Sequence, residues 1–301
     1  MKIYNYRTDM PRLDGERVMA LGFFDGVHIG HRRLLDVARR EAREKNLTFS
    51  VFTFADSSEI KRDTGRLYSD RERFFLIEEC GADEIVVAGF DDMKNLAPES
   101  FAKDFLCGVC SCRVAITGKD FRFGKGATAD ADALAALMKE SGGKAIAIDD
   151  VMLYSKKVST TAIKEYLKVG DTVRANEMLG APYFIRAEVE HGRGVGKTLG
   201  FPTLNCNLES RRGILRRGVY RSSVIIGGKC YDALTNVGTC PTFSEREEHA
   251  ETYILDFKGE LYGEEVRINL LKFLRDEMQF SSENELKMQI NIDINRVKNH
   301  K

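Results

Sequence analysis

The chain has 301 residues, with 46 basic and 46 acidic side chains, and therefore a formal net charge of zero. This length exceeds that of an ordinary single domain and predicts two domains, each large enough to bury a core. The charge balance argues against a function based mainly on electrostatic binding of nucleic acid or of an anionic membrane, although a local basic pocket remains compatible with it. No apolar stretch resembles a signal peptide or approaches the length of a membrane span, so we expect a cytoplasmic protein.

Seven cysteines in a chain of this length favour free thiols in a reducing compartment over a disulfide framework. Cys107, Cys110 and Cys112 are spaced like half of a metal site. No second pair of Cys or His residues stands at zinc-ligand spacing, so we expect buried structural cysteines and assign no zinc.

The first part of the chain, up to about residue 180, alternates apolar runs with helical patterns. Helix starts are indicated by the capping box of Ser69 with Glu72 and by Pro98. The runs typical of strands are residues 17–24, 47–54, 83–89, 112–118 and 144–149, and helical patterns include residues 31–45 and 131–140. This alternation predicts a parallel sheet covered by helices.

Two further helices are expected between residues 158 and 180, ended by Gly170 and Gly180. Beyond them the pattern changes to closely spaced strand-like segments, which predict a small antiparallel barrel. Turns between these segments are expected at Gly227–Gly228, at Lys258–Gly259 and near Gly263. We therefore place the domain boundary near Pro182, which gives domains 1–181 and 182–301.

A last helix is expected to start at the capping pair Ser282 and Glu285. Its apolar residues are spaced along one face, and they are Leu286, Ile290, Ile294 and Val297. This face predicts that the helix packs against the barrel.

The stretch GFFDGVHIGH, residues 22–31, places two of the five histidines around a glycine where a strand passes into a helix. Open α/β sheets bind ligands at such strand ends, and the N–H groups at a helix start attract phosphate. His28 and His31 are therefore candidates to donate hydrogen bonds to phosphate oxygens and to stabilise charge during attack on phosphorus. The alternative is that Gly26 and Gly30 shape the turn while the imidazoles only cap it.

The HIGH tetrapeptide resembles the motif of nucleotidyltransferases, and GFFDGVHIGH is similar to the N-terminal half of bacterial bifunctional riboflavin kinase/FAD synthetases. TGKDFRFGKG and VSTTAIK, residues 117–126 and 158–164, resemble further motifs of that half. GRGVGKTLGFPTLN, NVGTCPTF, ETYILDF and LYGEEV are similar to successive flavokinase motifs, in the correct order. The resemblance covers nearly the whole chain. It implies a Rossmann-like α/β nucleotidyltransferase domain followed by an antiparallel β-barrel of the riboflavin kinase type with a terminal helix.

The glycine-rich stretch of the second half is the candidate phosphate loop, because glycines let backbone N–H groups approach a polyphosphate closely. A flexible hairpin is the alternative. Thr203 and Asn205 follow with oxygen atoms suited to Mg²⁺, and the resemblance implies that they hold the metal that bridges the ATP phosphates. The candidate residues of the loop itself are Gly192, Gly194, Gly196 and Lys197, with Gly200 after them.

Phosphoryl transfer to an alcohol needs a group that accepts the hydroxyl proton. Glu251 corresponds to the catalytic base of the family, and the alternative is a solvated acid at the end of a charge-rich loop. Arg275 is a candidate to hold the flavin or its phosphate, with a surface ion pair as the alternative.

In the first half, attack of the FMN phosphate on the α-phosphorus of ATP requires alignment and charge stabilisation more than a base. The resemblance implies that His28 and His31 supply part of both. Arg122 is expected only to brace its loop, with Phe121 and Phe123 in the core. The implied nucleotide-binding residues are Gly22, Phe24, Asp25, Gly26, Asp120, Ser159, Thr160, Thr161 and Lys164.

The departures from the family pattern cluster in or beside the first half. Lys164 stands where arginine is usual, and lysine cannot reproduce a bidentate guanidinium contact to phosphate. The prolines that usually follow the pair Thr53-Phe54 are missing, and Ala181 stands where arginine is usual. The departures therefore concern adenylylation, whereas the kinase motifs are nearly intact.

The sequence thus predicts an enzyme that phosphorylates riboflavin to FMN and adenylylates FMN to FAD, with ATP as co-substrate and Mg²⁺ as cofactor. We expect small-molecule ligands, with no nucleic acid, membrane or obligatory protein partner. Three alternatives stay open: a kinase with a degenerate first half, a non-catalytic flavin-binding regulator, and a nucleotidyltransferase for another substrate. Thr203, Asn205 and Glu251 argue against the regulator, and the last alternative explains the first half only.

Overall fold

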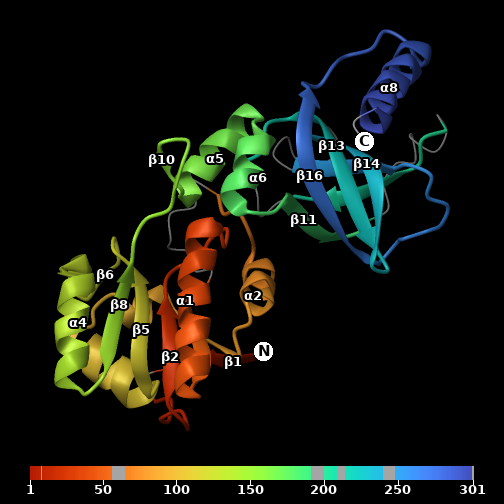
Figure 1. The fold of residues 1–301 in the computed structure, drawn as a ribbon. Coiled ribbons are helices and arrows are strands. Elements are labelled where there is room, and N and C mark those ends of the chain that lie inside the picture. The colour runs from red at the N-terminus through yellow and green to blue at the C-terminus, as the bar shows by residue number, and fades with distance from the viewer. Residues whose placement is uncertain (8, 56–64, 191–199, 209–213, 240–247, 300–301) are drawn as a thin grey trace. The chain divides into compact units, whose positions relative to one another are not determined.

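The computed structural model describes residues 1–7, 9–55, 65–190, 200–208, 214–239 and 248–299 (Figure 1). By its internal contacts the chain divides into two compact units. The first unit comprises Met1–Asp63 and Tyr68–Ser159, and the second comprises Thr64–Leu67 and Thr160–Lys301. We describe each unit by itself.

The described part of the first unit contains a six-stranded sheet with the order β1-β4-β3-β2-β5-β8, in which every neighbouring pair is parallel. Its strands are β1 (Lys2–Asn5), β2 (Arg17–Leu21), β3 (Thr48–Phe54), β4 (Glu84–Ala88), β5 (Cys112–Gly118) and β8 (Lys144–Ile148). The chain winds outward in one direction from β2 and in the other from β5, so the topological switch lies between these two strands. The predicted parallel α/β fold is confirmed, while β1, which no sequence pattern indicated, is added beside β4.

Helices cover both faces of this sheet (Figure 1). The connections from β2 to β3 and from β5 to β8 run in opposite directions, and right-handed crossovers then place their helices on opposite faces. Met19 and Leu21 of β2 pack in one apolar cluster with Phe105 and Leu134, which come from the helices on one side. The helices are α1 (Ile29–Lys45), α2 (Asp70–Glu79), α3 (Phe90–Met93), the π-helical segment η2 (Ser100–Val109) and α4 (Ala131–Glu140).

Several local predictions are confirmed in this unit. Ser69 and Glu72 form the predicted capping box at the start of α2. Short elements at the sheet's carboxyl edge were not predicted, and they are β6 (Arg122–Phe123), η3 (Lys125–Ala127), β7 (Ala129–Asp130), β9 (Met152–Leu153) and β10 (Lys156–Lys157).

Of the three clustered cysteines of this unit, Cys110 and Cys112 are buried, whereas Cys107 is only partly buried. Burial raises the pKa of the Cys110 thiol to about 12 and that of the Cys112 thiol well above its usual value. Such thiols are inert as nucleophiles and poor metal ligands. Among the described residues no group of three or more His, Cys, Asp or Glu side chains is placed to hold a metal ion.

The second unit begins with two helices, α5 (Thr160–Val169) and α6 (Thr172–Leu179). Gly170 and Gly180 follow them with φ angles of 83° and 73°, the left-handed conformation that glycine adopts most readily, as predicted. Asn176 of α6 donates a hydrogen bond of 2.9 Å to the carbonyl oxygen of Leu270. Contacts thus group residues 160–181 with the second unit, whereas the predicted boundary near Pro182 rests on the change in sequence pattern.

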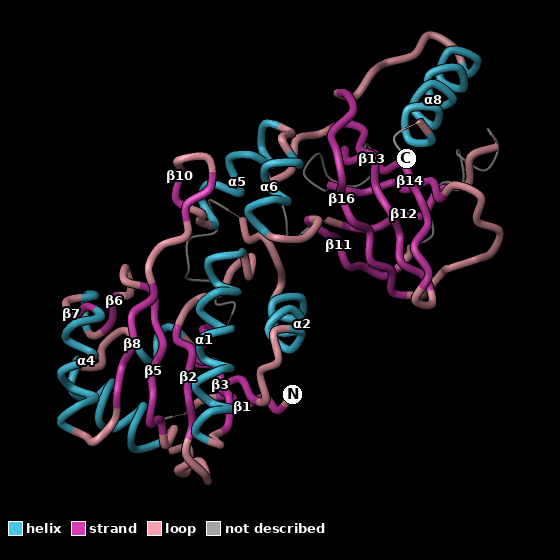
Figure 2. Tube along the Cα trace, viewed as in Figure 1, coloured by secondary structure: helices cyan, strands magenta, loops and turns pink. Residues whose placement is uncertain are grey.

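In its described part, the sheet of the second unit has six strands in the order β11-β16-β13-β14-β15-β12, with every neighbouring pair antiparallel. The strands are β11 (Tyr183–Glu188), β12 (Thr203–Asn207), β13 (Gly218–Ile226), β14 (Lys229–Thr239), β15 (Glu248–Ile254) and β16 (Glu265–Arg275). The two ends of the order meet at a single bridge between Glu190 and Asn205, so the sheet is curled into a partly closed barrel (Figure 2). The predicted antiparallel barrel is confirmed in this form.

The two faces of this sheet differ in character. On one face, the hydroxyls of Ser222, Thr235 and Thr252 form a buried chain with distances of 2.8 and 2.9 Å. Because side chains alternate along a strand, the neighbouring residues face the other way, toward the last helix. That helix, α8 (Glu283–Lys298), is capped by Ser282 as predicted, and its Ile294 and Val297 pack with residues of β13 and β14.

Within the described ranges, no helix is both long enough and apolar enough to cross a membrane.

A close backbone approach explains Gly218, the first residue of β13. Its φ of 141° lies in the region that favours glycine, and a Cβ atom there would overlap the carbonyl oxygen of Arg275. We expect Gly218→Ala to lower the free energy of unfolding by about 2–4 kcal/mol. In Gly228→Ala, with φ at 79° and no atom within 4 Å of the new Cβ, only the dihedral strain of about 1–2 kcal/mol applies. Urea unfolding measures both variants, and equal losses would contradict the overlap.

Candidate active sites

The HIGH turn lies at the carboxyl end of β2, beside the topological switch. His28 is the N-cap of α1, and its Nδ1 accepts a hydrogen bond of 3.2 Å from the backbone N–H of His31. In the preceding loop, Phe24 and Val27 have positive φ angles of 52° and 42°, which are uncommon for residues with a Cβ. Asp25 between them is 4% exposed. Strained backbone of this kind is concentrated at functional loops.

The two imidazoles of the turn are stacked, with ring centroids 3.7 Å apart and an interplanar angle of 11°. Gly30 stands between them in sequence, and a Cβ there would come within 3.2 Å of the His28 ring. The glycine of the motif therefore leaves room for the His28 ring beside the helix backbone. Phe24 packs edge-on against His31, at 5.2 Å between centroids.

Burial makes both imidazoles neutral near pH 7. It lowers the pKa of His28 to about 4, and it lowers the pKa of the partly buried His31 well below the usual value, with the charges of His28 and Arg73 acting in the same direction. Because Nδ1 of His28 accepts a hydrogen bond, the proton of the neutral ring is on Nε2. His31 Nδ1 is buried without a hydrogen-bond partner among the described residues. The pair can thus donate hydrogen bonds to an anion without carrying full positive charge.

Arg73 fixes the strand ends around this turn. Its side chain is fully buried and donates to the carbonyl oxygens of Phe23 and Phe54, the latter at 2.8 Å, and to Thr53 Oγ1 at 3.2 Å. It therefore joins the loops that follow β2 and β3. Arg73 was not predicted. In the sequence it follows the capping-box glutamate, and no local pattern distinguishes it there from a surface arginine.

Asp120 lies on the loop after β5, which pairs with β2. Its carboxylate is 2.7 Å from Lys157 Nζ, and Lys157 also contacts Asp150 at 2.8 Å. Burial is the largest influence on the pKa of His28, but the charges of Asp120 and Lys157 also act on it, in opposite directions. The structure thus brings predicted Asp120 near His28, together with Lys157, which was not predicted.

In the loop around Asp120, the core position expected for Phe123 is found, whereas that expected for Phe121 is found only in part. Arg122 is 3.4 Å from Asp130 across the β6–β7 pair, and Phe123 lies in the core. Phe121 is only partly buried and stacks on Phe123 at 5.7 Å.

The predicted Ser/Thr-rich segment divides between the two units. Ser159 is the last residue of the first unit, whereas Thr160, Thr161 and Lys164 lie on α5 in the second. Lys164 Nζ donates a hydrogen bond of 2.6 Å to the carbonyl oxygen of Gly65, within the second unit. Their common role with Ser159 in one nucleotide site stays a prediction.

In the second unit, strand register places Asn205, Glu251 and Asn236 directly opposite one another on β12, β15 and β14. Residues opposite one another on neighbouring strands point to the same face, at a strand spacing of about 4.8 Å. The next row on that face contains Thr203, Tyr253 and Leu234, again in register. Thr203 and Asn205, which were given no secondary structure in the sequence, belong to β12. The predicted loop residues Gly192, Gly194, Gly196 and Lys197 lie outside the described residues.

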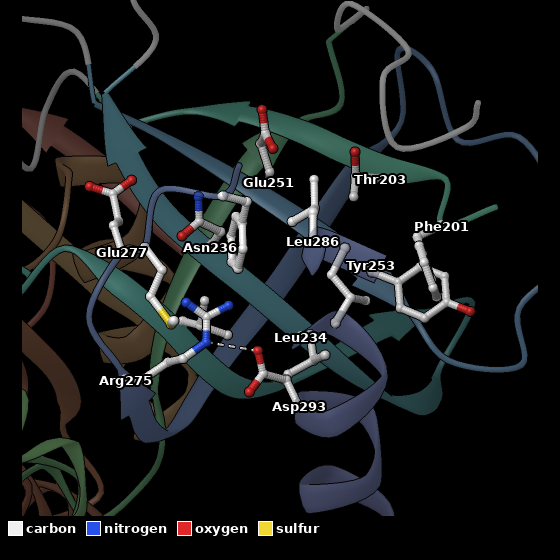
Figure 3. A pocket seen from close by; sticks show the side chains of 14 residues that line it. Phe201, Thr203, Leu234, Asn236, Glu251, Tyr253, Arg275, Glu277, Leu286 and Asp293 are labelled. Atoms are coloured by element: carbon white, nitrogen blue, oxygen red, sulfur yellow. Dashed lines mark hydrogen bonds and ion pairs between the residues drawn. The ribbon is translucent and has the colours of Figure 1, made fainter. Parts of the chain in front are cut away.

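All members of these rows except Asn205 line a pocket of about 330 Å³ between the outer face of the barrel and α8. Figure 3 shows Glu251 and Thr203 at one end, Arg275 and Asp293 at the other, and apolar side chains between them. Arg275 thus lies in the pocket, as predicted for a flavin-binding residue, and it also makes an ion pair with Asp293 at 2.9 Å. The apolar lining includes Phe201, Val219, Leu234, Tyr253, Leu286 and Ile290.

The donor set at the Glu251 end fits a hard cation. Thr203 and Asn205 supply a hydroxyl and an amide oxygen on one face of β12, and the Glu251 carboxylate lies opposite Asn205. Mg²⁺ prefers oxygen ligands and usually keeps waters and substrate phosphates in its remaining positions. Two neutral protein oxygens therefore suit a metal that arrives with ATP.

Three pocket residues with amide or carboxylate groups had no role predicted from the sequence, and they are Asn236, Glu277 and Asp293. Asn236 opens the quoted stretch NVGTCPTF but was given no role, because its position beside Glu251 depends on register between strands. Asp293 had a detectable signal, since it is an acid between Ile290 and Ile294 on the apolar side of the last helix.

The pKa values of the HIGH turn can be tested directly. We expect neither His28 nor His31 to show a protonation midpoint above about pH 5 in an NMR titration of the imidazole C–H signals, because burial disfavours the charged form. The variants His28→Gln and His31→Gln assign the signals. Since the unfolded chain binds these protons near pH 6.5 and the folded chain does not, their contribution to stability is present above that pH and is lost as the pH falls toward 4. A midpoint near 6.5 for either ring would contradict the assignment.

Comparison with known proteins finds relatives of both units. A family model described as FAD synthetase matches residues 10–162, and one described as riboflavin kinase matches residues 179–301. The bifunctional riboflavin kinase/FMN adenylyltransferase of Bacillus subtilis is 33% identical over 92% of this chain and 90% of its own length. The protein of that name from Escherichia coli K12 is also 33% identical, over 91% and 89%. A solved structure described as a macrolide-efflux protein from Streptococcus pneumoniae matches 100% of both chains with a TM-score of 0.89 and 28% identity. The chain belongs to the family of bifunctional riboflavin kinase/FMN adenylyltransferases.

Proposed function

We propose that the chain performs two successive reactions at separate sites: riboflavin is phosphorylated by ATP in the second unit, and the resulting FMN is adenylylated by ATP around the HIGH turn. The observation that supports this most strongly is the row of Asn205, Glu251 and Asn236 at the rim of an apolar pocket. A flat apolar ring system suits the lining, and a hydroxyl chain attached to it can reach the carboxylate.

In the kinase reaction, the isoalloxazine ring of riboflavin lies between the barrel wall and α8, and the terminal ribityl hydroxyl lies beside Glu251. Glu251 is solvent-exposed on its strand, and its carboxylate can accept the hydroxyl proton as the oxygen attacks the γ-phosphorus. Asn236 donates to the hydroxyl or to a phosphate oxygen from the neighbouring strand. Thr203 and Asn205 hold Mg²⁺, which when bound neutralises and orients the phosphates.

In the adenylylation reaction, a phosphate oxygen of FMN attacks the α-phosphorus of ATP and pyrophosphate leaves. This nucleophile is already anionic, so the protein needs to align the phosphates and to stabilise charge. His28 donates from Nε2 to a phosphate oxygen, and the start of α1 adds backbone N–H groups and its dipole. Asp120 and Ser159 are the further members of this site in the first unit.

A kinase without adenylylation is the second candidate, and Lys164 favours it. Lysine offers a single point charge where the family usually has a planar guanidinium, and its ammonium group is hydrogen-bonded to Gly65. Incubation with riboflavin, ATP and Mg²⁺ followed by chromatography of the flavins separates the candidates. FMN without FAD at any ATP concentration, in the wild type and in Lys164→Arg alike, would establish the kinase-only function.

Glu251→Gln tests the kinase site. We expect riboflavin phosphorylation to fall by a factor of about 10² to 10⁴, because the amide cannot accept the hydroxyl proton. FAD formation from FMN should stay nearly unchanged, since it takes place in the other unit. Glu260→Gln, at an exposed position in the turn before β16, is the matched control. A kinase rate equal to wild type in Glu251→Gln would refute the assignment.

The double variant His28→Ala/His31→Ala tests the first site. We expect it to abolish FAD formation from FMN and ATP, because the hydrogen-bond donors to the phosphates are lost. FMN formation from riboflavin should remain, and it also shows that the second unit is folded. Adenylylation at the wild-type rate would mean that the imidazoles only cap α1.

A further inference from the structure

Asp293 occupies an unusual position for a carboxylate. It lies on the side of α8 that faces the barrel, between Ile290 and Ile294, and only 2% of its side chain is exposed. Removing a charge from water costs free energy unless the charge is paired and hydrogen-bonded. An acid at this place therefore needs a partner, and its partner is part of the pocket wall.

That partner is Arg275 of β16. Arg275 Nε donates to Asp293 Oδ2 at 2.9 Å, and Arg275 Nη1 donates to the carbonyl oxygen of Asp276 at 3.0 Å. Gln289 holds the other carboxylate oxygen, Oδ1, at 3.1 Å, and the half-exposed Arg296 lies 3.6 Å from it. The carboxylate is thus fixed by its own helix and holds one edge of the guanidinium.

The remaining edge of the guanidinium faces the pocket. A guanidinium has five N–H donors, of which the two contacts above use two. Figure 3 shows the contact to Asp293 on one side of Arg275 and the pocket interior, with Asn236, on the other. Arg275 consequently offers donors in a fixed direction to whatever fills the pocket.

Strand register indicates which part of a flavin meets these donors. Arg275, Val219, Asn236 and Glu251 are opposite one another on four successive strands, β16, β13, β14 and β15. At about 4.8 Å per strand, Arg275 and Glu251 are roughly 14 Å apart along the sheet. A flavin whose ribityl hydroxyl reaches Glu251 can therefore place its ring system near Arg275, and the two carbonyl oxygens of that ring system are acceptors for the N–H donors of the guanidinium.

We propose that Asp293 is a positioning residue for flavin binding: it orients Arg275 so that the free N–H donors of the guanidinium meet a carbonyl oxygen of the flavin ring system. This inference rests on the proposed kinase function. A positioning role differs from a purely structural role, in which the ion pair between Arg275 and Asp293 would only attach α8 to the barrel. The apolar contacts of Ile294 and Val297 already provide such an attachment.

The first experiment uses the full chain with Asp293→Asn, which keeps the size of the side chain. Riboflavin affinity is measured without ATP by quenching of flavin fluorescence, and KM and kcat are measured for the kinase reaction. We expect Kd and KM for riboflavin to rise by roughly 10- to 100-fold, the effect of losing a charge-assisted hydrogen bond. We expect kcat to change by less than about threefold, since Glu251 and the phosphate contacts are untouched. Glu283→Gln, an exposed acid on the same helix, is the matched control.

The second experiment separates positioning from structural support. Arg275→Ala should weaken riboflavin binding, and adding Asp293→Asn to it should cause no further loss, because Asp293 acts through Arg275. Thermal unfolding reports on folding of the second unit in each variant, and FAD formation from FMN reports on the first unit.

Two results would overturn the proposal: an unchanged riboflavin Kd in Asp293→Asn, or the same fold-loss in the Arg275→Ala background as in the wild type. Failure of the proposed function has a different outcome, namely wild-type chain that binds riboflavin and does not phosphorylate it. In that case the Kd values still decide the role of Asp293. Wild-type chain that does not bind riboflavin would refute both.

Discussion

The kinase site depends on the register of three antiparallel strands. Asn205, Glu251 and Asn236 are opposite one another only because β12, β15 and β14 pair as they do. A slip of one residue in β15 would turn Glu251 to the inner face, where the Ser222, Thr235 and Thr252 hydroxyls form their own buried chain. That hydroxyl chain and the apolar contacts of α8 on the outer face both oppose such a slip. The same register that builds the barrel core therefore keeps the carboxylate, the oxygens proposed to bind Mg²⁺ and the pocket wall on one surface.

The two units use burial in opposite ways. Around the HIGH turn, burial removes charge, since the stacked imidazoles are neutral and act as oriented donors. In the flavin pocket, burial retains charge, because Arg275 and Asp293 compensate each other at 2.9 Å. The difference fits the ligands: phosphates bring their own negative charge and metal, whereas a neutral flavin ring offers carbonyl oxygens that respond to a charged donor. Neither arrangement needs a net charge on the protein, in agreement with equal numbers of acidic and basic residues.

Local sequence patterns predicted those features that depend on neighbouring residues. The capping box of Ser69 with Glu72 and the helix stops at Gly170 and Gly180 are satisfied within a few residues, and the structure has them as expected. Three features were not predicted, because each depends on contacts with distant parts of the chain. They are the strand β1, the hydrogen bonds of Arg73 to the strand ends, and the position of Asn236 beside Glu251. Thr203 and Asn205 were predicted as ligands from the family resemblance, whereas their place on β12 was not predicted.

The effect of a substitution can likewise be predicted from the sequence where it depends on a local motif. It cannot be predicted where it depends on contacts between distant parts of the chain. Lys164 in place of arginine is visible in one motif, and its consequence follows from the chemistry of two side chains. Asp293 is 18 residues from Arg275, on a different element, and the apolar spacing of the last helix gave no role to an acid there. A buried carboxylate that interrupts an apolar helix face nevertheless has to be compensated. Such an interruption thus predicts a partner across the interface, and in this fold the element facing α8 is the wall of the proposed flavin pocket.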